Sequence, residues 1–330
     1  MPEQKKVHLQ HSYFIVGERP FCLWDDNIKD MTLEFIDGLN PQYFSYIANT
    51  FGNSDAENKN NIQYLALLVR MTYSMALETF FALLASAIQA PFCVPAWIDQ
   101  YRPHELKSIV DKIHHEKPIL TCFNTEVLSW LTISNLLLSC LVLEDKSKES
   151  AIKTGFAQSW ASFASEFLET GISDEYNSIK HGLRIHSGSH RVFIGVQNEI
   201  GVPVPIDKLE LLSTSEFGTS YFKSETIGEL KHHKRLKRYR RNWCPAEMAD
   251  KLILLQMSMS NIQSSLKVIN GVSADKVQFV WPENFVNLDD ADNHSTFIGM
   301  TSMSGPNIVI KPEHIIQYSE NDILRHFEQK

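Results

Sequence analysis

One long helical pattern constrains the fold of this chain more than any other feature. From Asn58 to Ala90 the sequence NKNNIQYLALLVRMTYSMALETFFALLASAIQA places apolar residues at helical spacing, and Pro91 and Pro95 stop it. A helix of this length extends roughly 50 Å at about 1.5 Å per residue. Such an element must be covered on several sides, so the sequence predicts a helical bundle built around it.

Further helices are predicted on both sides of a segment with a different period. The predicted helices cover residues 103–115, 124–143, 151–169 and 245–270. One more helix is predicted to follow an N-cap at Ser173 or Asp174. Within residues 188–243 the period changes to two, with RVFIGVQ, VPVPID and KLELLSTS as short strands. We therefore predict a mainly α fold in five parts: a mixed segment 1–57, a bundle 58–187, a β-rich insertion 188–243, a returning bundle helix 244–271 and a mixed C-terminal region 272–330.

Composition indicates a cytoplasmic protein without disulfides. The 330 residues include five cysteines but no C-x-x-C pair, which favours reduced thiols, and MPEQKKVHLQHSYF has no apolar run typical of a signal peptide. The uncharged segment VLSWLTISNLLLSCLVL, residues 127–143, is shorter than the roughly 20 residues that span a bilayer. We expect a buried helix here and no membrane partner, with a membrane span as the alternative.

Positive charge is concentrated in one short run. The chain has a formal net charge of −8, yet KHHKRLKRYRR holds seven lysines and arginines in eleven residues. Such a cluster is typical of a face that meets a polyanion, and neighbouring Tyr239 and Trp243 could stack on bases. A solvated run, or one that pairs with the acidic remainder, is the alternative. The predicted nucleic-acid-binding residues are Lys231, Lys234, Arg235, Lys237, Arg238, Tyr239, Arg240 and Arg241.

A second polar cluster lies in EYNSIKHGLRIH, residues 175–186. Asn177, Lys180, His181 and Arg184 follow at spacings of three, four and seven, which predicts one stripe of a helix. A histidine can transfer a proton at neutral pH, and lysine or arginine can hold a phosphate. Metal-free RNA cleavage needs little more, because the ribose 2′-OH is the nucleophile. Helix capping by Asn177 and His181, with the two cations in solvent, would explain the same residues.

The stretch YNSIKHG resembles the R-N-x-I-x-H-G form of the motif of HEPN domains, which are helical bundles that include many ribonucleases of bacterial antiviral defence and toxin systems. Asn177, Ile179, His181 and Gly182 match it, and Tyr176 occupies the position of the family's catalytic arginine. The resemblance implies an RNA partner, a metal-independent cut without a cofactor, and a homodimer with a composite site. It also implies that a protein partner or antitoxin could restrain the activity.

The resemblance assigns roles to the residues that match. His181 would be the general base or acid, Asn177 would orient it, and Lys180 with Arg184 would hold the phosphate and replace the charge missing at Tyr176. In MALETFF, Glu78 resembles an acidic position of a preceding HEPN helix and would set the charge of the histidine. Arg70, Ser74 and Glu78 form one polar stripe, and an Arg70–Glu78 contact or a surface position would equally account for Glu78.

Two other classes of function are alternatives to a ribonuclease. A non-catalytic HEPN-like scaffold would retain the basic run and owe its lost activity to Tyr176. A zinc site at His181, His186 and His190 lacks a nearby cysteine or acidic ligand, so we expect no metal. No P-loop, G-x-G-x-x-G or G-x-S-x-G motif occurs, which argues against nucleotide hydrolysis, dinucleotide chemistry and serine-hydrolase chemistry.

Overall fold

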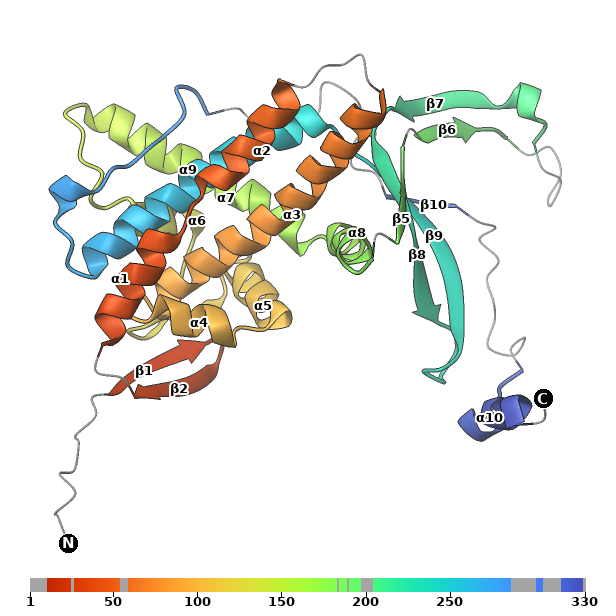
Figure 1. The fold of residues 1–330 in the computed structure, drawn as a ribbon, viewed down its shortest axis with the longest axis horizontal. Helices are drawn as coiled ribbons and strands as arrows, with labels where there is room; N and C mark the ends of the chain where they lie inside the picture. Colours follow the sequence, from red (N-terminus) through yellow and green to blue (C-terminus); the bar gives the residue numbers. More distant parts are fainter. Residues whose placement is uncertain are drawn as a thin grey trace, which may run out of the picture. The chain divides into compact units, whose positions relative to one another are not determined.

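The chain is mainly α and divides into two compact units (Figure 1). The computed structural model describes residues 11–24, 27–53, 59–182, 184–188, 190–196, 204–285, 301–304 and 316–328. The first unit, Met1–Ser173 with Pro245–Asn293, is called the helical unit below. The second, Asp174–Cys244 with His294–Lys330, is called the sheet unit. The boundary between them falls within helix α8, Thr170–Lys180.

The helical unit contains most of the helices and two small hairpins. Strands β1 and β2 pair antiparallel, as do β3 and β4. The helices and strands are α1 (Ile28–Gly38), α2 (Gln42–Gly52), α3 (Lys59–Gln89), α4 (Val94–Gln100), α5 (Pro103–His114), α6 (Trp130–Leu137), α7 (Lys146–Leu168), α9 (Pro245–Ile269), β1 (His11–Val16), β2 (Arg19–Trp24), β3 (Pro118–Leu120) and β4 (Thr125–Val127), followed by a 3-10 turn, Ala274–Lys276.

Helix α3 is the spine of this unit, as its sequence predicts. It packs against α2, α7 and α9, and the core lies among these helices (Figure 1). Phe80 of α3 is fully buried with its ring 5.8 Å from that of Trp160 on α7. The indole N–H of Trp160 donates to Ser258 Oγ of α9 at 3.0 Å. Burial of these large rings stabilises the packing of the three helices.

The polar stripe of α3 continues into the buried region between these helices. Arg70 and Ser74 are buried, and between them Tyr73 donates from its hydroxyl to Glu166 Oε2 of α7 at 2.7 Å. Glu166 also accepts from Lys251 Nζ of α9 at 2.8 Å. Burial, followed by the charge of Glu166, raises the pKa of Tyr73. A paired polar network thus joins α3, α7 and α9.

Helix α3 has the length and hydropathy of a membrane span but the burial of a core helix. Within the described residues, one helix, Asn60–Gln89, is long and apolar enough to cross a bilayer, and 67% of its tested window is buried inside the structure. Such burial is what a core helix of a soluble protein shows. The uncharged segment 127–143 does not form a long helix.

The predicted helix 124–143 is wrong. Thr125–Val127 forms strand β4 beside β3, and α6 extends over Trp130–Leu137 alone. Ser129 is the N-cap, and its hydroxyl accepts from Thr132 N at 3.1 Å. The β-branched residues around Glu126 favour the strand, and a serine cap begins the helix after it.

Two other helix starts differ from the prediction. Helix α7 begins at Lys146 rather than Ala151, because Asp145 accepts hydrogen bonds from the backbone of Ser147 and Lys148. Helix α8 begins at Thr170, so Ser173 and Asp174 lie within it instead of capping it. Helices α5 and α9 agree closely with their predicted ranges, and Gly271, at φ 91°, follows the end of α9.

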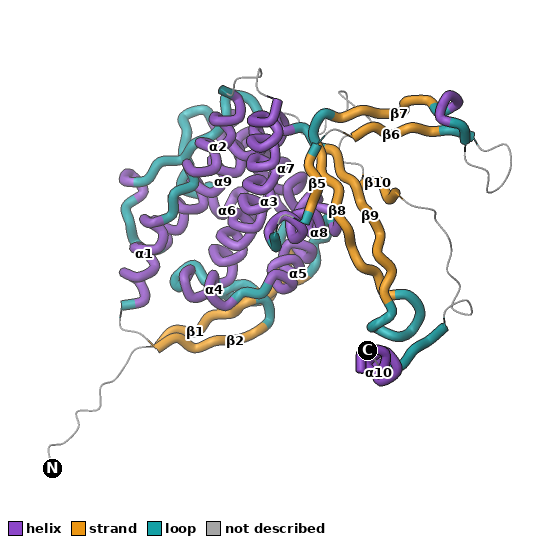
Figure 2. Tube along the Cα trace, turned by 45° about the vertical axis from the view of Figure 1, so that its right-hand side comes forward, coloured by secondary structure: helices purple, strands orange, loops and turns teal. Residues whose placement is uncertain are grey.

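The sheet unit is built around an antiparallel hairpin of two nine-residue strands (Figure 2). The strand order is β10-β9-β8-β5, and β6 with β7 forms a separate ribbon. VPVPID contains a 3-10 turn, Ile206–Lys208, rather than a strand in its described part, and residues 202–203 lie outside the described residues. The elements are β5 (Ile185–Ser187), β6 (His190–Ile194), β7 (Glu210–Ser215), β8 (Gly218–Thr226), β9 (Lys234–Asn242), β10 (Thr301–Ser304) and α10 (Glu320–Glu328).

The turn between β8 and β9 is bound to the C-terminal segment. His232 Nε2 lies 2.7 Å from Tyr318 O, and His233 Nε2 lies 3.2 Å from both Tyr318 O and Tyr318 N. His232 Nδ1 is 3.8 Å from Glu320 Oε1. The adjacent histidines, which the sequence placed in the basic run, therefore hold the segment that leads into α10. Most of the remaining C-terminal region lies outside the described residues.

The N-terminal turn of α7 gives a testable pH dependence. Glu149 accepts from Lys153 Nζ at 2.8 Å, Lys146 Nζ at 2.9 Å and the backbone of Leu143 at 3.1 Å. These hydrogen bonds lower the pKa of Glu149 to about 2. Since an unfolded glutamate titrates near about 4.3, the stabilisation is complete above that pH and is lost as pH falls toward 2.

We expect Glu149→Gln to lower the melting temperature most above about pH 5. The difference from wild type should shrink steadily between about pH 4.3 and pH 2, as followed by thermal unfolding at each pH. Glu144→Gln, a change at an exposed carboxylate five residues earlier, is the control. A difference that grows as the pH falls would contradict the assignment.

Candidate nucleic-acid interface

A buried carboxylate fixes α8 on the sheet. Glu175 is fully buried and accepts hydrogen bonds from the Thr219 hydroxyl of β8 and from the Trp243 indole N–H, the latter at 3.1 Å. Arg241 Nε of β9 lies 3.9 Å from Glu175 Oε2. One residue earlier, Asp174 pairs with Lys223 Nζ at 2.5 Å. Helix α8 therefore covers the face of the sheet that presents Thr219, Lys223 and Arg241.

The C-terminal end of α8 is exposed and carries the motif residues. Asn177, Lys180 and His181 are exposed, and His181 N donates to Asn177 O at 3.1 Å. Gly182 follows with φ 99°, a left-handed conformation typical of the residue after a helix end. The chain then turns back, since Arg184 N donates to Ser178 O at 2.8 Å. The glycine of the motif thus has a structural role.

Arg184 does not share the helical stripe that its spacing predicted. Helix α8 ends at Lys180, so only Asn177 and Lys180 of the four lie within it, and His181 directly follows it. The backbone hydrogen bond from Arg184 to Ser178 still keeps this exposed arginine beside the helix end. The four polar residues are therefore neighbours along one solvent-exposed turn.

Tyr176 has a packing partner of its own at the position where the HEPN motif has arginine. Its side chain is half-buried, and Lys180 Nζ lies 5.5 Å from the centre of its ring. This is a cation–π distance. Lys180, one turn along the same helix, therefore places its positive charge over the ring that stands at this position.

Glu78 belongs to the helical unit, and the motif residues belong to the sheet unit. Glu78 is half-buried, and Tyr101 donates from its hydroxyl to Glu78 Oε1 at 3.4 Å. Arg70, its predicted alternative partner, is buried two turns earlier on α3. A partnership of Glu78 with His181 stays a prediction.

The basic run forms strand β9 and the turn before it, so its side chains alternate between two faces. Lys237, Tyr239 and Arg241 lie on the face that α8 covers. On this face Lys237 pairs with Glu225, and the Tyr239 hydroxyl donates to the same carboxylate. The Tyr239 ring stacks on buried Tyr221 at 5.8 Å. Arg235 opposes Glu225 in the strand register. This face has carboxylates for its cations.

The other set shares the opposite face of the sheet, called the open face below. Lys234, Arg238 and Arg240 lie on it beside Phe222 and Leu236. The Arg238 guanidinium stands 4.7 Å from the centre of the Phe222 ring, and Lys234 Nζ donates to Thr226 Oγ1 at 2.8 Å. Among the paired residues of β8 and β9, no Asp or Glu falls on this face. Lys231 lies exposed in the turn before β9.

Three residues that organise the site were missed by sequence reasoning: Glu175, Thr219 and Phe222. The burial of Glu175 could have been predicted from helical spacing. It lies three residues after Ile172 and four before Ile179, which are both buried, so it shares their side of α8, away from the exposed motif residues. Trp243, predicted to stack on bases, is buried against Glu175, so its ring is not available to a base. Phe222 had no signal in the sequence, since its exposure depends on the pairing of β8 with β9.

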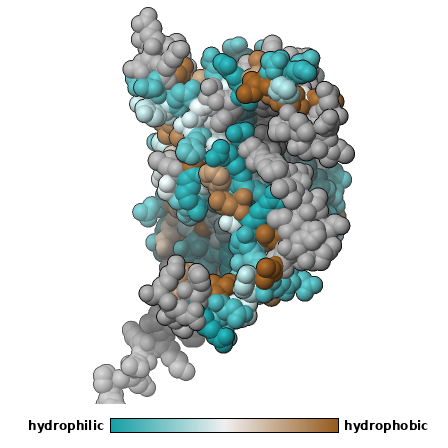
Figure 3. Space-filling view, turned by 90° about the vertical axis from the view of Figure 1, so that its right-hand side faces the viewer, coloured by the Kyte–Doolittle hydropathy of each residue, from teal (hydrophilic) through white to brown (hydrophobic). Residues whose placement is uncertain are grey.

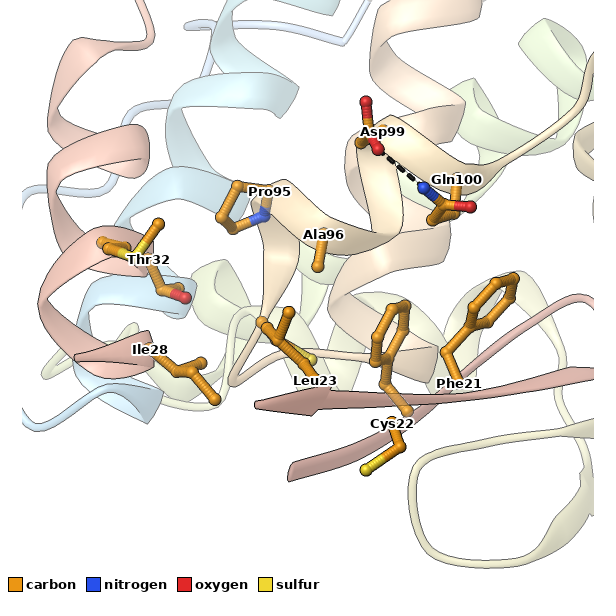
Figure 4. Close-up of a pocket in the computed structure, with 12 residues that line it drawn as sticks. Phe21, Cys22, Leu23, Ile28, Thr32, Pro95, Ala96, Asp99 and Gln100 are labelled. Atoms are coloured by element: carbon orange, nitrogen blue, oxygen red, sulfur yellow. Dashed lines mark hydrogen bonds between the residues drawn. The ribbon is translucent and has the colours of Figure 1, made fainter. Parts of the chain in front are cut away.

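A separate cavity of about 470 Å³ lies in the helical unit between the β1–β2 hairpin, α1 and α4 (Figure 4). Apolar side chains such as Phe21, Leu23 and Ile28 line it, and Asp99 and Gln100 share a 2.7 Å hydrogen bond at its edge. Burial raises the pKa of Cys93 in its wall to about 11, so this thiol stays protonated at neutral pH. The lining carries no lysine, arginine or histidine, so the cavity does not suit a phosphate.

Within the described ranges, no group of three or more His, Cys, Asp and Glu side chains is placed to hold a metal ion. No protein-family model, curated protein or solved structure matches the chain.

Glu175→Gln should strongly destabilise the sheet unit, because it removes the buried negative charge that accepts from the Thr219 hydroxyl and the Trp243 indole N–H and lies 3.9 Å from Arg241 Nε. We expect a loss of about 3 kcal/mol or more in the free energy of unfolding. Hydrogen exchange at the β8 and β9 amides would measure it, since opening of this unit exposes those amides.

Asp174→Asn is the matched control on the same helix. Its partner Lys223 is more exposed, with 44% of the side chain accessible, so the loss should be about 1 kcal/mol or less. Equal losses in the two variants would contradict the central role of Glu175.

Proposed function

We propose that this protein is a cytoplasmic HEPN-like RNA-binding protein in which the exposed end of α8 and the basic strand β9 serve one substrate. The proposal is supported chiefly by the exposure of Asn177, Lys180, His181 and Arg184 along one turn of the unit that also contains the basic run. Exposed cations attract phosphates, and their number sets the salt dependence of binding.

Cleavage is the activity that the exposed histidine favours. The oxygen of a ribose 2′-OH would attack the adjacent phosphorus, the P–O5′ bond would break, and the products would be a 2′,3′-cyclic phosphate and a 5′-OH. His181 would take the 2′-OH proton or give a proton to the leaving oxygen. Lys180 and Arg184 would stabilise the charge on the phosphate, and Asn177 would orient His181.

A single histidine can fill one of the two proton-transfer roles at a time. The HEPN resemblance implies a homodimer that brings a second motif helix to the site, and a second His181 would then fill the other role. The resemblance also supports a place in a bacterial antiviral defence or toxin system, where a protein partner or antitoxin would restrain cleavage.

A binding protein without catalysis is the second candidate, and Tyr176 favours it. The half-buried ring with Lys180 over it fills the position where the motif's arginine would contact the phosphate. Such a scaffold would bind RNA or an acidic protein through the same basic strand without cutting.

Incubation of full-length protein with end-labelled RNA in EDTA separates the two candidates. We expect cleavage that leaves a 2′,3′-cyclic phosphate, loss of at least about a hundredfold in rate with His181→Ala, and no cut in an oligonucleotide with 2′-deoxyribose throughout. His104→Ala, at an exposed histidine of the helical unit, should cut like wild type. Bound but intact RNA would favour the scaffold, and cleavage unchanged by His181→Ala would overturn the assignment of this site.

A further inference from the structure

We propose that the open face of the sheet binds single-stranded RNA, with Phe222 and Arg238 stacking on bases and Lys234 and Arg240 contacting phosphates. This inference rests on the proposed function and adds the form of the substrate and the surface that reads it. The observation that supports it is that the basic run divides between two faces of the sheet, of which only one has carboxylates beside its cations.

The division follows from strand geometry. Successive side chains of a strand point to opposite faces, so the six cations of the run that lie in β9 cannot act as one patch. Lys237 and Arg241 face Glu225 and Glu175 on the α8 side. Lys234, Arg238 and Arg240 fall on the face where the paired residues of β8 and β9 include no carboxylate. Positive charge is therefore left for a polyanion on the open face.

The apolar groups of the open face are unusual for a surface that meets only phosphates. Phe222 is 45% exposed and Leu236 is 65% exposed, although both stand among cations. The space-filling view in Figure 3, which shows one side of the molecule, has small separate apolar patches among hydrophilic groups. Aromatic rings beside arginine are the groups on which unpaired bases stack.

These features favour a single strand over a duplex. In a duplex the bases are already stacked on each other and paired, so a flat aromatic surface cannot reach their faces. Along β9, side chains of one face recur about every 6.8 Å, and Lys234 to Arg240 cover about 20 Å. This is an extended row of three cations with Leu236 between the first two and Phe222 beside Arg238, suited to an extended chain of phosphates and bases.

Fluorescence anisotropy with a labelled 20-nucleotide oligouridylate tests the inference. All proteins would be full-length and carry His181→Ala, so that the probe stays intact. Phe222→Ala and the double variant Arg238→Ala/Arg240→Ala should each weaken binding about fivefold or more. Phe222→Leu, which keeps an apolar group but removes the ring, should weaken it like Phe222→Ala.

Lys237→Ala is the matched control, because it removes a cation from the same strand but from the face where Glu225 neutralises it. Its affinity should stay within about twofold of the parent. For the two phosphate contacts of Lys234 and Arg240 on a single strand, the slope of log K against log salt should be about −1.4, and the double variant, which removes one of them, should lower its magnitude by about 0.7. A paired hairpin RNA should bind more weakly than the oligouridylate.

The outcomes separate this inference from the proposed function. If the parent binds the oligouridylate but the open-face variants bind as well as Lys237→Ala, the open face is not the site, and the proposed function stands. Tighter binding to the hairpin than to the single strand overturns the choice of substrate. If the parent binds neither RNA at low salt, both proposals fail.

Discussion

The buried carboxylate of Glu175 is the interaction on which the sheet unit depends. A charge inside a protein is stable only when it is paired and hydrogen-bonded. Glu175 meets this condition through Thr219 and Trp243, with Arg241 nearby, so that it joins α8, β8 and the end of β9. Because α8 is held by its middle, its C-terminal end stays free to expose Asn177, Lys180 and His181.

Strand geometry gives the basic strand two faces, and Glu175 lies on the side of one of them. Arg241 is drawn inward by Glu175, and strand alternation carries Lys237 and Tyr239 to the same side, where Glu225 meets them. The cations that remain exposed are fewer than the sequence suggests, but they stand beside an accessible aromatic ring. Charge count alone would therefore overstate the number of phosphate contacts and miss the stacking group.

How much of the structure could be predicted from the sequence differs between the two units. Helices α3, α5 and α9 were predictable because apolar periodicity, prolines and a terminal glycine mark them. The segment 124–143 was predicted as one helix because its long uncharged run outweighed the local cap at Ser129, and the pairing of β4 with β3 is a contact between two strands that helical periodicity does not reveal. For the site, the exposed polar turn around His181 was predictable from spacing, whereas the position of Arg184 after the helix end was not. The two faces of β9 follow from a strand assignment that the run of cations gave no reason to expect.

Photo-crosslinking of the full-length protein to an oligouridylate containing 4-thiouridine, followed by mass spectrometry of the crosslinked peptides, tests the central claim most directly. The claim is that the sheet keeps one face for the nucleic acid and gives the other to α8. Crosslinks should then fall on Phe222 and on the open-face positions of β9. Crosslinks on Tyr239, or within the helical unit without any on Phe222, would contradict it.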